Sequence, residues 1–303
     1  MKILTIPNVE LDSLCYKNPK RYPFLLESVG HNSDNRYSIL FSHPGETIVL
    51  NDLDSFDFLS ALESKVKINS KKTDLPFSGG WFVYLSYELI GQIEPILKDN
   101  LNPSNDVVAY AVEIPTAIVV DKLTKETFLI DQFGSDKRLS QVLEDIKNVS
   151  MIPNKELKGK LSFEDEEKFL HGVGSSKDYI KAGDVFQVNL SREWKYKLNP
   201  SVSATQIYQS LKKSNPAPFA ALAQFDGFSV ISSSPERLFS VKDDIVQTRP
   251  IAGTHPRGDG EEDELLKIRL INHPKEQAEH VMLLDLERND MGRVCKYGSV
   301  HVN

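Results

Sequence analysis

The chain has 303 residues, enough for one large domain or two ordinary ones, and its 40% hydrophobic and 26% charged content is typical of a globular protein. Acidic residues outnumber basic ones by 43 to 36, which argues against a nucleic-acid binder, whose surface must be basic. No apolar run approaches the roughly 18 residues that span a membrane. Two cysteines, Cys15 and Cys295, cannot form a disulfide framework, so we expect a reducing, cytoplasmic compartment.

The first half of the sequence is predicted to be rich in strands. Its apolar and β-branched runs are separated by turn residues, and two amphipathic segments interrupt them. The expected strands are residues 37–41, 46–50, 81–85, 107–120 and 126–131, and the expected helices are residues 55–66 and 138–147. The most polar stretch, 135–160, gives the best internal boundary, so we expect one part at 1–150 and another at 151–303.

The second half contains clearer signals. Asp226 and Gly227 join two apolar runs, and this dipeptide suits the positive φ angles of a tight hairpin turn. The remaining expected elements are a strand pair at 238–241 and 245–247, a helix capped by Ser162, and a helix from about 261 that is interrupted near Pro274 and resumes to Arg288. Strands in series followed by helices indicate an α+β fold with antiparallel sheets, not repeated βαβ units.

Glu279 is unusual because it lies on the apolar face of a predicted helix. The stripe that it shares at 3.6 residues per turn contains Met282, Leu283 and Leu286, with Glu276 close to it. A carboxylate in this position must be paired, protonated or bound to a cation. Two interpretations stay open: an ion pair with Arg288 or Arg293, or a Mg²⁺ ligand, since Mg²⁺ prefers hard oxygen donors.

Glu236 directly follows a predicted strand and the residues 232–235 (SSSP). The proline ends the pairing of that strand and turns the chain. Glu236 therefore projects either into a cleft, where it could act as a general acid, or into solvent as an ordinary turn residue.

Residues 248–258 (TRPIAGTHPRG) combine a strand end with glycine, proline and arginine. Gly253 would let a ligand approach the backbone, and its N–H could hold a carboxylate. Arg257 could bind a carboxylate through its planar guanidinium. The alternative is an ordinary loop with solvated arginines.

Four blocks of the second half carry a family resemblance. They are residues 183–191 (GDVFQVNLS), 233–236 (SSPE), 249–254 (RPIAGT) and 278–294 (AEHVMLLDLERNDMGRV). In this order they resemble the chorismate-utilising enzymes, and four ordered blocks are far more specific than any one of them. Residues 24–28 and 36–38 resemble the family's N-terminal region more loosely.

The resemblance implies a large α+β fold in which two antiparallel sheets enclose helices. It also implies Mg²⁺ bound to the chorismate carboxylate, with Glu279 as a ligand. Glu236 would be the acid that helps the C4 hydroxyl leave, because a neutral glutamic acid can donate a proton when desolvation raises its pKa. Ala252, the Gly253 amide and Thr254 would belong to the substrate pocket.

Gln187 bears on which reaction to expect. Family members that add water carry a lysine at this position as the base, and glutamine cannot take up a proton at neutral pH. Ammonia needs no such activation, so Gln187 favours an aminating member. This class resembles the large subunits of aminodeoxychorismate synthase and anthranilate synthase, which receive ammonia from a glutamine amidotransferase partner.

The choice between these two enzymes rests on conflicting residues. Residues 215–219 (NPAPF), 188–191 and 234–238 resemble aminodeoxychorismate synthase more closely. Against this, such synthases commonly carry a nucleophilic lysine where this chain has Ala252, as anthranilate synthases do, and alanine cannot form a covalent adduct. On balance the motifs favour aminodeoxychorismate synthase, and anthranilate synthase is the alternative.

The resemblance also implies that family members continue well beyond residue 303. We expect the chain to end inside a strand at 298–303, and to lack the part that supplies a second Mg²⁺ carboxylate. A non-catalytic protein with the chorismate-enzyme fold is therefore a third interpretation.

Overall fold

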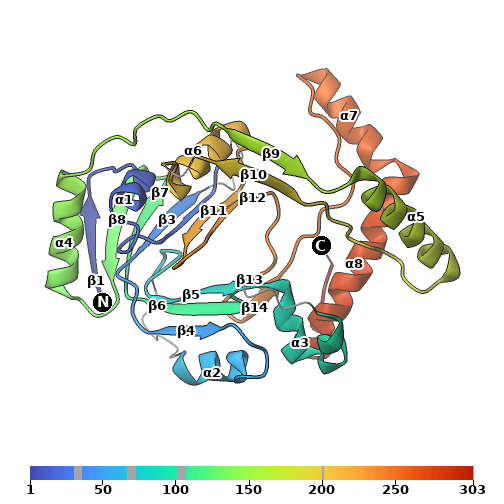
Figure 1. Ribbon diagram of the computed structural model, residues 1–303, viewed down its shortest axis with the longest axis horizontal. Coiled ribbons are helices and arrows are strands. Elements are labelled where there is room, and N and C mark those ends of the chain that lie inside the picture. The colour runs from blue at the N-terminus through green and yellow to red at the C-terminus, as the bar shows by residue number, and fades with distance from the viewer. Residues whose placement is uncertain (31–35, 67–72, 102–106, 200, 303) are drawn as a thin grey trace.

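A computed structural model describes residues 1–30, 36–66, 73–101, 107–199 and 201–302 (Figure 1). The structure combines helices with sheets whose strands all pair antiparallel in the described part of the chain. The prediction of an α+β fold with antiparallel sheets is confirmed.

The largest sheet has seven strands in the order β1-β8-β7-β3-β2-β11-β12. These strands are β1 (Lys2–Ile6), β2 (Phe24–Glu27), β3 (Tyr37–Ser42), β7 (Thr116–Asp121), β8 (Glu126–Asp131), β11 (Phe219–Gln224) and β12 (Ser229–Ser234). Leu222 of β11 pairs with Leu25 of β2, which joins the second half of the chain to the first. The division at residue 150 stays a prediction, although this sheet draws strands from both sides of it.

A second sheet packs on one face of the first. It consists of β4 (Thr47–Leu50), β5 (Gly80–Leu85) and β6 (Ala109–Ile114), in the order β4-β6-β5. The rings of Phe24 on β2 and Phe82 on β5 stack across the interface with centroids 4.0 Å apart. Because side chains alternate between the two faces of a strand, Phe24 points to this sheet while its neighbour Leu25 points to the opposite face.

Helices cover the outer faces of both sheets. The large sheet carries α1 (Leu11–Lys17), α4 (Asp136–Lys147) and α6 (Ala204–Ser214), whose apolar residues form one core with Leu25 and its neighbours (Figure 1). The small sheet carries α2 (Phe58–Lys65) and the short helices η1 (Tyr87–Leu89), α3 (Ile90–Ile93) and η2 (Pro95–Asn100). Ser203 caps α6 through a reciprocal bond pair with Gln206.

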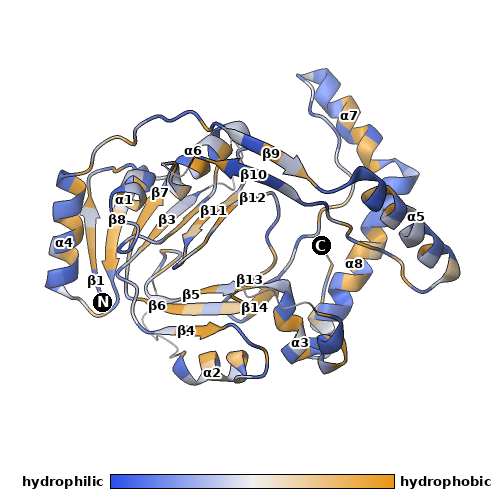
Figure 2. Ribbon diagram, viewed as in Figure 1, coloured by the Kyte–Doolittle hydropathy of each residue, from blue (hydrophilic) through white to orange (hydrophobic). Residues whose placement is uncertain are grey.

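The remaining elements extend from this layered body. They are β9 (Gly159–Phe163), α5 (Glu166–Ala182), β10 (Trp194–Leu198), β13 (Ser240–Lys242), β14 (Ile245–Gln247), α7 (Glu261–Ile271) and α8 (Pro274–Val294). No residue of α5, α7 or α8 is buried, and every residue of β9 is exposed. Figure 2 shows hydrophobic and hydrophilic stretches alternating along these helices, whereas strands of the large sheet are mostly hydrophobic.

Most predicted elements of the second half are confirmed. Gly227 has φ of 89° in the β11–β12 turn, and Asp243 and Asp244 have positive φ in the β13–β14 turn. The helix interruption also lies as predicted, since α7 ends at Ile271 and α8 begins at Pro274.

Two expectations were wrong in detail. Ser162 does not cap a helix but lies in β9, and Asp165 caps α5 by accepting from the Glu167 N–H. Residues 298–302 are not in a strand. Across the described ranges, no helix is both long and apolar enough to cross a bilayer.

Candidate active site

Glu236 lies just beyond the end of β12, as the sequence predicts. Its backbone is fixed by Ser234, whose hydroxyl accepts from the Glu236 N–H at 3.4 Å and donates to the Glu236 carbonyl at 3.1 Å. Its side-chain Oε1 accepts a hydrogen bond of 2.9 Å from the backbone N–H of Ile251. The exposed carboxylate is therefore oriented by the segment 249–254, which the sequence had marked as part of the same site.

Gly253 lies against the carboxylate of Glu276 at the start of α8. A Cβ atom added to Gly253 would overlap that carboxylate and stand 2.9 Å from its Cγ. The Glu276 side chain is only 17% exposed, so it has little room to move away. Glycine is therefore favoured at this position by the close approach of Glu276 and not by its backbone angles. Ala252 is half-buried and Thr254 is exposed on the same segment.

Glu279 lies half-buried one turn further along α8. The two arginines considered as ion-pair partners are engaged elsewhere: Arg288 pairs with Asp285 at 2.7 Å, and Arg293 lies 3.8 Å from Glu94. In the described ranges no basic side chain pairs with Glu279. The ion-pair interpretation of Glu279 is therefore not supported.

Glu276 makes more contacts at the candidate site than the sequence pattern indicated. Besides its contact with Gly253, its Oε1 lies 3.9 Å from Nδ1 of His273, which is buried without a hydrogen-bond partner among the described residues. The ring of His255 lies 6.2 Å from that of His273. The spacing Glu276–Glu279 was the available signal, because residues three apart share a helix face.

Two predicted site residues make no hydrogen bond or ion pair with Glu236, Gly253, Glu276 or Glu279 in the described ranges. Gln187 lies exposed in the loop between α5 and β10 and makes no hydrogen bond to the described residues. Arg257 is occupied by a carboxylate of the chain itself, since its Nε donates to Asp263 Oδ1 at 2.6 Å.

A cavity of about 550 Å³ adjoins the Glu236 turn. Its walls come from β14 and the segment after it, from one face of α8, and from the residues before the C-terminus. His280, Leu284 and Arg288 contribute to it from α8 at a spacing of four residues. The sequence analysis did not identify this cavity, although that spacing was a readable signal.

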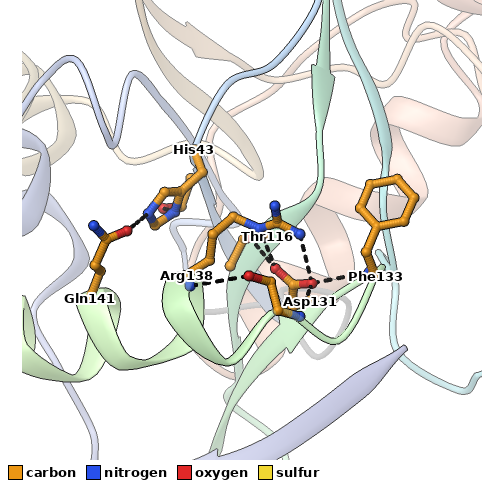
Figure 3. Close-up of polar contacts among 8 residues, drawn as sticks. His43, Thr116, Asp131, Phe133, Arg138 and Gln141 are labelled. Carbon is orange, nitrogen blue, oxygen red and sulfur yellow. Dashed lines mark hydrogen bonds and ion pairs between the residues drawn. The ribbon is translucent and has the colours of Figure 1, made fainter.

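A second polar network, apart from these residues, lies where β7 begins and β8 ends in the large sheet. Arg138 and the hydroxyl of Thr116 both donate to the carboxylate of Asp131 (Figure 3). Burial alone would raise the pKa of Asp131, but these donors and the Ser135 N–H outweigh it and lower the pKa to about 2. Beside it, burial lowers the pKa of His43, which contacts Gln141. This network holds α4 against β8.

Known proteins resemble the chain over most of its length. The family described as chorismate binding enzyme matches residues 22–303. An anthranilate synthase component I-like protein of Synechocystis sp. is 36% identical over 287 residues, with 91% of this chain and 59% of the relative covered. Aminodeoxychorismate synthase component 1 of Bacillus subtilis is 40% identical over 240 residues, with 75% and 51% covered.

Among solved structures, anthranilate synthase component I from Streptococcus pneumoniae superposes with a TM-score of 0.74 at 28% identity, covering 91% of this chain and 66% of that one. The chain thus spans about half to two thirds of the length of the proteins it matches.

Proposed function

Because the chain belongs to the chorismate-binding enzymes, we propose that it serves in the Mg²⁺-dependent amination of chorismate to 4-amino-4-deoxychorismate, with ammonia from a glutaminase partner. The observation that carries this proposal is the bond between Glu236 and the Ile251 N–H. It holds a carboxyl group beside the segment of Gly253, where one oxygen is anchored and the other is left to face a substrate.

In this proposal Glu236 protonates the C4 hydroxyl as it leaves. A positioned acid of this kind typically accelerates a reaction by about 10²–10⁴-fold. Glu236 is exposed in the free chain, so a bound substrate must cover it to exclude competing water. The backbone N–H of Gly253 and the hydroxyl of Thr254 would orient a substrate carboxylate.

The residues of α8 fit a magnesium ion. Glu276 and Glu279 present two carboxylates from consecutive turns, and Mg²⁺ is usually bound by one or two protein carboxylates and several waters. When bound, Mg²⁺ would offset the charge of the substrate carboxylate.

Gln187 supports amination over hydration, since its amide cannot act as a base that activates water. An external ammonia source is supported by the environment of Cys15. Cys15 is fully buried, and burial raises the pKa of its thiol well above the usual value, which disfavours the thiolate that a glutaminase needs. Ammonia would therefore come from an amidotransferase subunit.

A second candidate is the anthranilate synthase reaction. Ala252 favours it, because no nucleophile stands at this position next to Gly253. Several relatives carry that name as well.

Product identification tests the proposal. The chain is incubated with chorismate, Mg²⁺ and ammonium, and the products are separated. We expect aminodeoxychorismate, which keeps its enolpyruvyl side chain. Anthranilate with released pyruvate would establish the second candidate, and isochorismate would contradict amination altogether. If no chorismate is consumed, the chain by itself is a non-catalytic member of the family.

A further inference from the structure

The hairpin β13–β14 turns through two residues with uncommon backbone angles. Asp243 and Asp244 both have positive φ, 49° and 63°, and the pair Lys242–Ile245 closes the strands directly next to them. Positive φ at both central residues is the geometry of a tight hairpin turn whose twist matches that of its strands. Such a turn determines which residues of the two strands face each other.

The register of this hairpin leads directly to the Glu236 contact. Its outermost strand pair is Ser240 with Gln247. Glu236 lies four residues before Ser240, and Ile251 lies four residues after Gln247. Glu236 and Ile251 are therefore opposite each other in the register that the turn sets, and the Ile251 N–H donates to Oε1 of Glu236 at 2.9 Å.

Between the hairpin and that contact, the described chain forms no strand. β13 begins at Ser240 and β14 ends at Gln247, and Pro250 has no N–H with which to continue the pairing. A side chain spans this gap, because the hydroxyl of Thr248 donates to the carbonyl of Leu238 at 3.2 Å. Thr248 is half-buried and Leu238 is exposed, so the bond ties a solvent-facing stretch of chain to the base of the hairpin.

We propose that Thr248 is a positioning residue for the Glu236 carboxyl group. Its hydroxyl holds the two chain segments together where the strand pairing has stopped, and this keeps the Ile251 N–H within reach of Glu236. Without that bond the exposed turn would open locally, because few buried contacts restrain it. The effect on turnover rests on the proposed function, whereas the placement of the carboxyl group can be measured without any reaction.

The amide proton resonance of Ile251, in ¹H–¹⁵N spectra of the whole chain, measures this placement. Glu236→Ala removes the acceptor and gives the resonance of the unbonded N–H. Thr248→Val keeps the branched shape of the side chain without its hydroxyl, and we expect it to move the resonance about half of the way to that position or further, since a hydrogen bond weakens steeply when its geometry is lost. Thr248→Ser keeps the hydroxyl and should keep the original resonance.

The matched control is Thr47→Val at the start of β4. It removes a bond of the same kind, from a threonine hydroxyl to a backbone carbonyl, that of Gly45, at 3.4 Å. This variant should leave the Ile251 resonance where it is. The proposal is overturned if Thr248→Val leaves that resonance in place, or if Thr47→Val displaces it equally.

Turnover of chorismate is the second readout. Thr248→Val should lower kcat by about tenfold with little change in KM, because a misplaced acid weakens the transition state and not the binding of substrate. Thr248→Ser should retain the original kcat. In a chain that turns over chorismate, an unchanged kcat of Thr248→Val would also overturn the proposal. If neither the chain nor its variants consume chorismate, the proposed function fails and the Ile251 resonance alone decides the role of Thr248.

Discussion

The carboxylate of Glu276 occupies the space that a side chain on Gly253 would need. The contact joins the start of α8 to the segment whose Ile251 N–H holds Glu236. The predicted acid and the predicted metal-binding helix are therefore linked through one glycine, and this link determines how the site responds to substitution.

Gly253→Ala tests that link. The new methyl group has to displace Glu276 or the segment 249–254, so we expect turnover of chorismate to fall by at least tenfold and the Mg²⁺ requirement to rise. The control is Gly174→Ala on α5, where no atom lies within 4 Å of the added methyl. That variant should keep full activity and be slightly more stable, because alanine is the better helix former by about 1 kcal/mol. Equal activity of both variants would show that Glu276 moves freely.

Glu236→Gln removes the proposed acid but keeps its geometry. The glutamine oxygen can still accept the Ile251 N–H, whereas the amide cannot supply a proton. We expect kcat to fall by about 10²–10⁴-fold with an unchanged unfolding curve. Glu167→Gln, the same change at an exposed position of α5, is the control. If kcat falls by less than a few-fold, Glu236 is an ordinary turn residue and not the acid.

Glu279→Ala should weaken the binding of magnesium. Removing one of two carboxylates leaves Glu276 as the remaining protein donor on this face, so we expect the Mg²⁺ concentration for half-maximal binding to rise about tenfold or more. Calorimetric titration with MgCl₂ measures it, and Glu264→Ala on α7 is the control. If the variant binds Mg²⁺ as tightly as the unsubstituted chain, Glu279 is not a magnesium ligand.

The Asp131 network makes stability depend on pH. The pKa of Asp131 is about 2 in the folded chain and near 3.9 when unfolded, so its contribution is complete above pH 4 and is lost as the pH falls through 2. The difference between these two pKa values corresponds to about 2.6 kcal/mol of stability. Asp131→Asn should therefore lower the free energy of unfolding at pH 7 and have much less effect near pH 2.

Urea unfolding at both pH values measures this difference. Asp136→Asn is the matched control, because that carboxylate is exposed and its ion pair with Lys2 should contribute less than about 1 kcal/mol. A pH-independent effect of Asp131→Asn would mean that shape, not charge, holds α4 in place.

Glutamine in place of ammonium tests the partner. With the chain alone we expect no product from glutamine, since the buried Cys15 cannot present a thiolate to it. Cys15→Ser should leave ammonium-dependent turnover unaltered. Glutamine-dependent turnover without a second subunit would reveal an amidotransferase site in this chain.

Local signals predicted local structure well. The turn at Asp226-Gly227 and the break before Pro274 are both present, because each depends on the φ preferences of one or two residues. The cap at Ser162 was wrong because its segment pairs with β10, a contact that no local pattern contains. Strand partners in general depend on distant residues.

The residues of the candidate site could likewise be predicted one by one, but the contacts between them could not. The motifs marked Glu236, Gly253 and Glu279 individually, and the strand end predicted the place of the first. The contact of Gly253 with Glu276 joins residues 23 positions apart, and the cavity beside the Glu236 turn lies between β14, α8 and the residues before the C-terminus. Such convergence is set by tertiary packing and could not be derived from spacing.

The lack of buried residues in α5, α7 and α8 has a consequence for how the chain opens. Amide protons in the core strands should exchange with deuterium only on global unfolding, because Leu25, Leu222 and Ile118 are fully buried around them. The three helices lack such anchors and should exchange through small local openings. A protease should therefore cut first around α5, α7 and α8 and leave the layered sheets as the resistant remainder, while a ligand that bridges α8 to the Glu236 turn should slow that cleavage.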